Sequence, residues 1–187
     1  MAILKIARMG HPVLHQKAHA VADPASPEIA ALVGHMIDTL ADAGGVGLAA
    51  PQVHVSQRVV IFFVPEERAG DDEEAPEDLT VMINPKIEPL SPDKELSWEA
   101  CLSVPGLMGA VPRYTHIRYS WTAPDGQPMS REAHGFHARV VQHECDHLDG
   151  VLYTMRMEDM RLFGFTEETH RNPELISVAH PDEEVIE

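Results

Sequence analysis

The stretch Gln142-His143-Glu144-Cys145-Asp146-His147 contains the pattern His-Glu-x-x-His, and the rest of the chain is interpreted from it. In a helix, His143 and His147 lie about one turn apart on one face, where two imidazoles can hold a divalent metal. Glu144 lies about 100° around the helix from His143, so its carboxylate can reach a metal-bound water without being a ligand. This combination of Lewis acid, water and general base indicates a metallohydrolase, whereas a polar helix with two surface histidines is the alternative.

The residues around this pattern favour a buried helix from Gly135 to Asp149, ended by Gly150. Helical spacing places four residues on one face and three on another: Phe136, Val140, His143 and His147, then Val141, Cys145 and Leu148. Both faces are largely apolar, so the histidine pair is expected to be buried, where a metal supplies the partner that it needs. Cys145 points away from His143 and is assigned to the core.

Composition limits the class of protein. The 187 residues suit a single domain, and 14 basic against 30 acidic residues give a net charge of −16. Two segments, Glu66–Asp78 and Glu167–Glu187, hold 15 of the acidic residues and 2 of the basic ones, so the remainder is nearly neutral. Without a basic stripe, nucleic-acid binding is not predicted. No stretch approaches the roughly 20 apolar residues of a membrane span, so we expect a soluble cytoplasmic protein.

The order of predicted elements indicates an α+β fold. Ser26-Pro27-Glu28 is a helix start, and apolar residues at helical spacing continue to Gly44-Gly45. Short strands are predicted at Arg58–Val64, Thr80–Asn84, Ile87–Leu90, Lys94–Trp98, Ile117–Trp121 and, after a turn at Pro124-Asp125-Gly126, Gln127–Ala133. We therefore expect mostly antiparallel, short-stranded sheets packed around a central metal-binding helix, with an N-terminal helix.

The end of the chain is less regular. Val151-Leu152-Tyr153 is predicted as a short strand and Arg156–Phe165 as a short helix. The acidic, proline-interrupted sequence that follows resembles a flexible tail. We expect one catalytic domain over residues 1–165 and a tail over residues 166–187.

Two histidines leave a metal half-coordinated, so a third ligand is needed. His170 and His180 lie downstream in the acidic tail, and Cys101 lies upstream in Trp98–Gly106. A Cys101 thiolate would complete a Cys-His-His set with a fourth position open for water. The alternative role for Cys101 is that of a small buried hydrophobic residue.

Three stretches together resemble the peptide deformylase family, which carries Gly-x-Gly-x-Ala-Ala-x-Gln, Glu-Gly-Cys-Leu-Ser and Gln-His-Glu-x-Asp-His in this order. They appear here as Gly45–Gln52, Glu99–Ser103 and Gln142–His147, within a resemblance that covers residues 1–165. The second stretch departs at Ala100, where the family usually has glycine. Because a Cβ costs about 1–2 kcal/mol in the left-handed region, we predict that Ala100 is extended and that Cys101 still faces the metal.

The resemblance implies removal of the formyl group from N-formylmethionine at the start of newly made proteins. It implies that Cys101, His143 and His147 hold one divalent metal per chain, usually Fe(II), with Zn(II), Ni(II) or Co(II) as possible substitutes. Glu144 would act as general base and then acid for a metal-bound water. The Gln52 amide and the Leu102 backbone N–H would meet the developing oxyanion.

The same resemblance implies the surroundings of the metal. The methionine side chain needs an apolar pocket, for which Val46, Phe136 and Val140 are the candidates, and Gly47 would let the substrate backbone lie close. Ligand-orienting groups would be Glu99, Arg113 and Asp146. The expected partners are N-formylmethionyl peptides and nascent chains, with transient proximity to the ribosome. The alternatives are another metal-dependent amidase or peptidase, and a non-catalytic metal-binding module for nascent chains.

Overall fold

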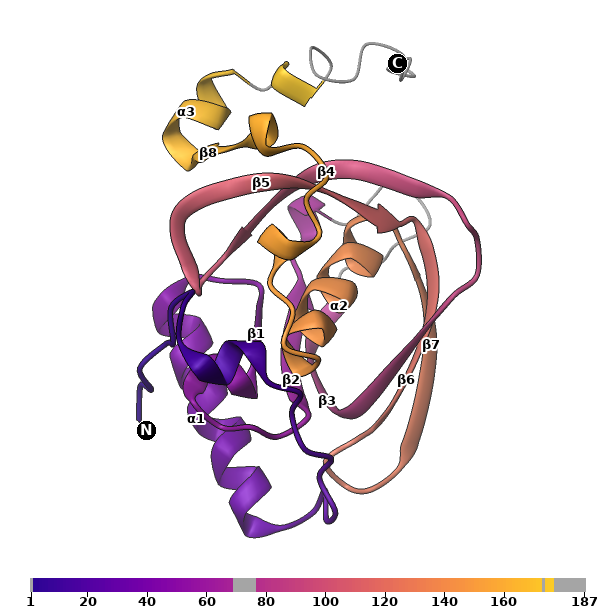
Figure 1. Ribbon diagram of the computed structural model, residues 1–187. Coiled ribbons are helices and arrows are strands. Elements are labelled where there is room, and N and C mark those ends of the chain that lie inside the picture. The colour runs from indigo at the N-terminus through magenta and orange to yellow at the C-terminus, as the bar shows by residue number, and fades with distance from the viewer. Residues whose placement is uncertain (1, 69–76, 173, 177–187) are drawn as a thin grey trace.

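A computed structural model describes residues 2–68, 77–172 and 174–176, and in it two antiparallel sheets enclose one helix (Figure 1). The five-stranded sheet has the order β1-β2-β3-β6-β7: Gly47–Ala49, Val59–Val64, Glu77–Pro89, His116–Thr122 and Pro128–His134. The three-stranded sheet has the order β4-β5-β8: Lys94–Cys101, Val104–Tyr114 and Phe163–Phe165. Helix α2 (Gly135–Leu148) lies between them, which confirms the predicted α+β class.

The N-terminal helix α1 (Pro27–Ala43) starts and stops where the sequence indicates. The Ser26 hydroxyl accepts a hydrogen bond from the Ile29 N–H at 3.3 Å, and Gly44 ends the helix with a φ of 68°. Its apolar face includes Met36 and Leu40, which belong to one core cluster with β2. This helix packs against the five-stranded sheet, and its Thr39 hydroxyl also accepts a hydrogen bond from the Leu4 N–H at 2.9 Å.

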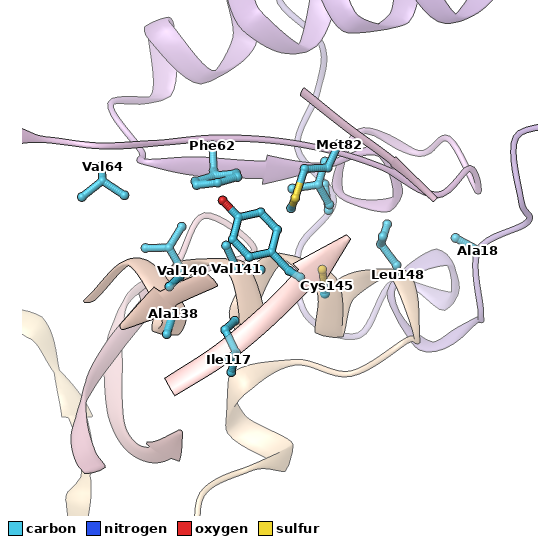
Figure 2. Packing of buried hydrophobic residues seen from close by; sticks show 14 residues of the cluster. Ala18, Phe62, Val64, Met82, Ile117, Ala138, Val140, Val141, Cys145 and Leu148 are labelled. Atoms are coloured by element: carbon cyan, nitrogen blue, oxygen red, sulfur yellow. The ribbon is translucent and has the colours of Figure 1, made fainter. Parts of the chain in front are cut away.

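Helix α2 is buried along its length, because every residue from His137 to Leu148 lies below the surface. Figure 2 shows Phe62 and Met82 of the large sheet lying over Val141 and Cys145 of this helix. The apolar face therefore fixes the helix against the sheet. Its span differs from the predicted one by a single residue, since Asp149 is the cap and Gly150 follows with a φ of 74°.

His137 gives the core a pH dependence that can be measured. Its Nε2 lies 3.0 Å from the Tyr119 hydroxyl, and burial, helped by the nearby Arg131, lowers the pKa of His137 to about 4. Its unfolded pKa is about 6.5, so protonation favours unfolding, and stability is lost as the pH falls from about 6.5 towards 4. Relative to His137→Phe, the wild type should lose about 2 kcal/mol of unfolding free energy between pH 7 and pH 5.

Urea unfolding at several pH values measures this difference. His137→Phe also leaves the Tyr119 hydroxyl without its partner, but that offset does not depend on pH in this range. Changing the exposed His170 to Phe is the control and should leave the pH dependence as in the wild type. Parallel curves for the wild type and His137→Phe would contradict a buried neutral imidazole.

The strand predicted to end at Asn84-Pro85 does not end there. Strand β3 continues from Glu77 to Pro89, with a register shift between Ile83 and Lys86 where Asn84 has a φ of 53°. The Asn84 side chain accepts from the Val21 N–H and donates to the Val21 carbonyl, both at 2.9 Å. These two bonds fix the bulge, so a turn signal in the sequence marks a kink within one strand. The strand predicted at Ile87–Leu90 is the last part of β3.

Strand β5 was not predicted, because prolines and glycines interrupt it at Pro105, Gly106, Gly109 and Pro112. It nevertheless pairs with β4 from Lys94↔Tyr114 onward, and this pairing extends β4 to Cys101. The prediction for residues 151–165 was wrong in both parts. Residues Tyr153–Met155 and Met160–Leu162 form single 3₁₀ turns, and Phe163–Phe165 is strand β8, paired with β5.

The acidic segments are described in part. The loop expected over Glu66–Asp78 begins with a 3₁₀ turn, Glu66–Arg68, and its last two residues belong to β3, while residues 69–76 lie outside the described ranges. The tail begins with helix α3 (Thr166–Arg171), in which Thr169 is buried. Residues 177–187 are outside the described ranges, so the division at residue 165 stays a prediction. No helix in the described ranges is long and apolar enough to cross a membrane.

Candidate active site

Three side chains converge at the centre of the fold in the arrangement of a metal site. Ligand atoms of Cys101, His143 and His147 all lie within 4.8 Å of one another, and Cys101 Sγ is 3.4 Å from His147 Nε2. Cys101 is the last residue of β4, and the two histidines lie one turn apart on α2. His170 lies on α3, outside this cluster, and His180 is outside the described residues. Cys145 packs in the core and both cysteines are free thiols.

The chemistry of these donors fits a divalent metal. Burial opposes ionisation of Cys101, but the neighbouring His147 and His143 keep the pKa of its thiol well below the usual value. His143 Nδ1 is 2.9 Å from Glu99 Oε2, so Nε2 is the ring nitrogen that remains available to a metal. One thiolate and two imidazoles with an open fourth position suit Zn(II) and Fe(II).

A buried ion network holds His143 in place. Two nitrogens of Arg113 donate to the Glu99 carboxylate at 2.8 and 2.9 Å, and Arg139 Nη1 donates to it at 2.9 Å. Burial raises the pKa of Glu99, but the bonds from Arg113 and His143 outweigh it and keep the pKa well below the usual range. Glu99 therefore remains a carboxylate that fixes the tautomer and orientation of His143.

The network continues behind α2. Arg113 also donates to Asp146, and Arg156 Nη2 donates to the other Asp146 oxygen at 2.7 Å. The structure thus brings together the three residues that we expected to orient ligands, with Asp146 acting through Arg113 and Glu99 rather than on a histidine directly. Sequence reasoning missed Arg139. Its signal was present, because it lies four residues before His143 on the metal-facing side of α2.

The Glu144 carboxylate lies beside this cluster. It is only 5% exposed, and its Oε2 has no hydrogen-bond partner among the described residues. Burial raises the pKa of Glu144 to about 7, against the effect of the two neighbouring imidazoles. The carboxylate lines the same pocket as His143 and Cys101 without belonging to the cluster of three donors. It can therefore exchange a proton with a group in that pocket.

The position of this carboxylate depends on the absence of a side chain at Gly47. A Cβ at this residue would lie 2.6 Å from Cδ of Glu144, which is far too close. Gly47→Ala should therefore displace the carboxylate and lower turnover by about 10- to 100-fold, since displacements near 1 Å have effects of this size. Turnover and metal content measured on the same sample test this, and the metal content should not change.

Gly34→Ala is the matched control for this substitution. Gly34 lies within α1, and a Cβ there would meet no atom within 4 Å. It should raise the stability by about 1 kcal/mol through helix propensity and leave turnover unchanged. If Gly47→Ala turns over as fast as Gly34→Ala, the carboxylate does not need its observed position.

The two predicted oxyanion donors lie next to the cluster. The Gln52 side chain is 1% exposed, and its Oε1 accepts from the Ala49 N–H at 2.8 Å, which directs Nε2 towards the site. Nε2 lies 3.2 Å from the Ser103 hydroxyl and 3.5 Å from Cys101 Sγ. Leu102 follows Cys101 and lines the same pocket. An anionic oxygen in that pocket would therefore find N–H groups on this side.

The pocket itself has a volume of about 460 Å³, and all four residues predicted to bind substrate line it: Val46, Gly47, Phe136 and Val140. Sequence reasoning did not find Trp98, Leu107 or Arg68, which also line it; the Arg68 guanidinium lies 5.0 Å from the centre of the Phe136 ring. It also missed Tyr153, whose ring stacks on His143 with centroids 6.2 Å apart. These residues carry no motif, so only the fold identifies them.

Ala100, which stands where the family usually has glycine, has the extended conformation that was predicted. Ala100 lies in β4, where it pairs with Met108, and the only described non-glycine residues with positive φ are His54 and Asn84. Its side chain is exposed, so the added methyl group meets no packing conflict. Cys101 still faces the two histidines.

An α+β fold with a His-Glu-x-x-His helix, a cysteine that converges on both histidines and a carboxylate beside them defines a metal-dependent hydrolase. A profile of the polypeptide deformylase family matches residues 3–162. Peptide deformylase 1 of Bordetella pertussis is 54% identical over 163 residues, which is 87% of this chain and 92% of that protein. Peptide deformylase 1 of Nitrosomonas europaea is 50% identical over 166 residues, covering 88% and 93% of the two chains.

Solved structures agree with these relatives. The peptide deformylase of Ehrlichia chaffeensis has a TM-score of 0.77 at 29% identity, covering 95% of this chain and 96% of its own. A class I type b peptide deformylase from Acinetobacter baumannii has a TM-score of 0.75 at 34% identity, covering 84% and 100%. The chain belongs to the peptide deformylase family. It is a divalent-metal hydrolase that removes the N-formyl group from N-formylmethionine of newly made proteins and releases formate.

Proposed function

We propose that Cys101, His143 and His147 hold the metal of this deformylase and that Glu144 is its general base. The convergence of the three donors beside a buried carboxylate oxygen without a partner carries this proposal. When bound, the metal supplies a Lewis acid that polarises the formyl carbonyl and makes water more acidic. Glu144 takes a proton from the attacking water and then delivers it to the departing amine nitrogen.

The remaining residues position the formyl group and stabilise the charge that develops on it. As water adds to the formyl carbon, the carbonyl oxygen becomes anionic and accepts hydrogen bonds from Gln52 Nε2 and the Leu102 N–H. The Ala49 N–H, bound to Gln52 Oε1 at 2.8 Å, keeps the amide in the orientation that donates. Because these donors are already in place, they need no rearrangement during the reaction.

We propose that the apolar wall of the pocket selects methionine. Val46, Phe136 and Val140 line it next to the cluster, and an unbranched thioether chain suits a pocket of this shape and polarity. Gly47 supplies the close approach of a substrate backbone at its edge. Formyl-Met-peptide and acetyl-Met-peptide assayed side by side test the preference for the formyl group. Equal turnover of the two would instead favour a more general metal amidase on the same site.

Fe(II) is the metal that we propose for the enzyme in the cell, by the resemblance to its family. Sulfur and nitrogen donors suit Fe(II) and Zn(II) about equally, so the ligand set alone does not choose between them. We expect higher turnover with Fe(II), Ni(II) or Co(II) than with Zn(II), measured on apoenzyme reloaded anaerobically with each metal. Highest turnover with Zn(II) would contradict this assignment.

The substrate also bears on where the enzyme works. N-formylmethionyl chains emerge from ribosomes, so we propose that the enzyme acts in the cytoplasm, near ribosomes and without stable attachment to them. The net charge of −16 supports the last point, because an acidic protein is repelled by ribosomal RNA. Co-sedimentation with ribosomes at low salt tests it, and no stable binding is expected.

A further inference from the structure

A second cavity lies behind α2 and is larger than the active-site pocket. Its volume is about 1020 Å³, against about 460 Å³ for the pocket that holds the cluster, and the two share no lining residue. Gln142, Cys145 and Asp146 of α2 and its C-cap Asp149 line it, on the side of the helix away from Glu144. The bulged part of β3 and the end of β5 form its other walls. None of the residues proposed to bind the metal, to act as base or to contact the substrate faces this cavity, whereas Arg113 and Asp146, which line it, belong to the network behind Glu99.

Basic side chains are concentrated around this cavity, although the protein as a whole is acidic. Six basic residues line it and only three acidic ones, Asp146, Asp149 and Glu158; the basic ones are Lys17, Arg58, Lys86, Lys94, Arg113 and Arg156. The chain has four lysines in all, so only Lys5 lies elsewhere. The excess of positive charge is therefore local, against a net charge of −16 for the whole chain.

Three of these basic side chains have no carboxylate partner among the described residues and can therefore bind a ligand. In the described ranges neither Lys17 nor Lys86 forms an ion pair, and both are exposed. The Lys94 ammonium lies 4.8 Å from the centre of the Tyr114 ring and also has no carboxylate partner there. The three arginines are paired: Arg58 with Asp149, and Arg113 and Arg156 with Asp146. An anion in the cavity would thus meet unpaired ammonium groups first.

We propose that this cavity binds a compact anion with two or more negative charges, such as a phosphorylated metabolite or a polycarboxylate, and that its binding lowers deformylase activity. A long polyanion is disfavoured, because beyond the cavity it would find few further ammonium groups, since three of the four lysines of the chain line the cavity. A compact ligand can lie wholly within the positive region. Guanidinium and ammonium groups recognise phosphate and carboxylate alike, so the two sources share one chemistry.

The link to the active site is a chain of charged hydrogen bonds. Arg156, whose side chain is 50% exposed at the cavity, donates to Asp146, which Arg113 also holds. Arg113 in turn donates to the Glu99 carboxylate, which orients His143. An anion that draws Arg156 from Asp146 leaves Arg113 as the main partner of Asp146. Arg113 then holds Glu99 less firmly, and His143 loses part of its orientation.

Calorimetric titration of the metal-loaded enzyme at low salt tests the site, with pyrophosphate and tricarballylate as the two probes. Lys17→Gln/Lys86→Gln should weaken binding by about fivefold or more, since each exposed charge contributes a modest factor. Lys5→Gln removes the same charge elsewhere and should not change binding. Tighter binding of pyrophosphate would assign phosphate chemistry to the natural ligand, and tighter binding of tricarballylate would assign carboxylate chemistry.

Formyl-peptide turnover on the same samples tests the coupling. The bound probe should lower turnover of the wild type and of Lys5→Gln severalfold, and should have little effect on the double variant. Because both probes can chelate metals, metal content is measured before and after. The proposal is overturned if the double variant binds the probe as tightly as the wild type, or if the bound probe leaves turnover unchanged. Turnover measured without a probe tests the proposed function independently of the anion site, because neither Lys17 nor Lys86 lies at the active site.

Discussion

Glu144→Gln is expected to retain the metal and lose turnover by about 10²- to 10⁴-fold, which is the range that a general base contributes. The amide has nearly the shape of the carboxylate, so the pocket beside Gly47 still accepts it. It cannot take a proton from water, however, and Glu144 is not one of the three converging donors. Metal analysis and formyl-peptide kinetics on one preparation measure both effects.

The matched control for this substitution is Glu88→Gln, which makes the same change at an exposed strand residue. It should leave turnover and metal content as in the wild type. The pH profile gives a second check. A base must be ionised, and burial raises the pKa of Glu144 to about 7, while a bound cation lowers it again. Turnover should therefore fall as the pH decreases through a value at or below about 7. A metal-free Glu144→Gln would mean that Glu144 is a ligand.

The elements that the sequence predicted correctly are those whose signals are local. Helix α1 has its N-cap at Ser26 and its stop at Gly44, and α2 has an apolar period of 3.6 residues with Gly150 beyond its end. Strand β2 is a continuous apolar run, and the hairpin at Pro124–Gly126 carries its own turn residues. In each case the residues that set the structure lie within a few positions of one another.

The elements that could not be predicted depend on distant partners. Asn84 reads as a strand end, but its two bonds to Val21, 63 residues away, convert the turn signal into a bulge. Strand β5 contains Pro112 and Gly109, which disfavour strands, and its pairing with β4 outweighs that preference. The sequence therefore misplaced the elements whose stability comes from tertiary contacts.

The active site shows the same division. The spacing of His143 and His147 is local, so it could be predicted with the helix, whereas the proposed third ligand, Cys101, lies 46 residues from His147. Sequence spacing did not decide whether Cys101 or one of the downstream histidines is the third ligand. Only the resemblance to the peptide deformylase family favoured Cys101. The hydrogen bonds that hold Glu99 are also non-local, since their donors are Arg113 of β5 and Arg139 of α2. Tyr153, from a turn after α2, could not be placed against His143 without the fold.

Cys101→Ala is expected to lose the metal and, with it, more than about 100-fold in turnover. The substitution removes one of the three proposed protein ligands, and among these three donors only the thiolate is anionic. Two imidazoles at the spacing of one helical turn remain, and they bind divalent metals far more weakly than a set of three. Metal content after gel filtration, together with turnover at added metal, measures the loss.

Cys145→Ala separates this effect from the loss of a buried sulfur. Both cysteines are buried and free, but Cys145 lies on the face of α2 that packs against Phe62 and Met82 (Figure 2). Its replacement leaves a small cavity and should lower the unfolding free energy by about 1 kcal/mol while metal content and turnover stay unchanged. Each variant thus removes one buried sulfur atom, from the end of β4 beside the histidines in Cys101→Ala and from the core face of α2 in Cys145→Ala. If Cys101→Ala retained the metal as Cys145→Ala does, the third ligand would have to be another residue, and the assignment of Cys101 would be wrong.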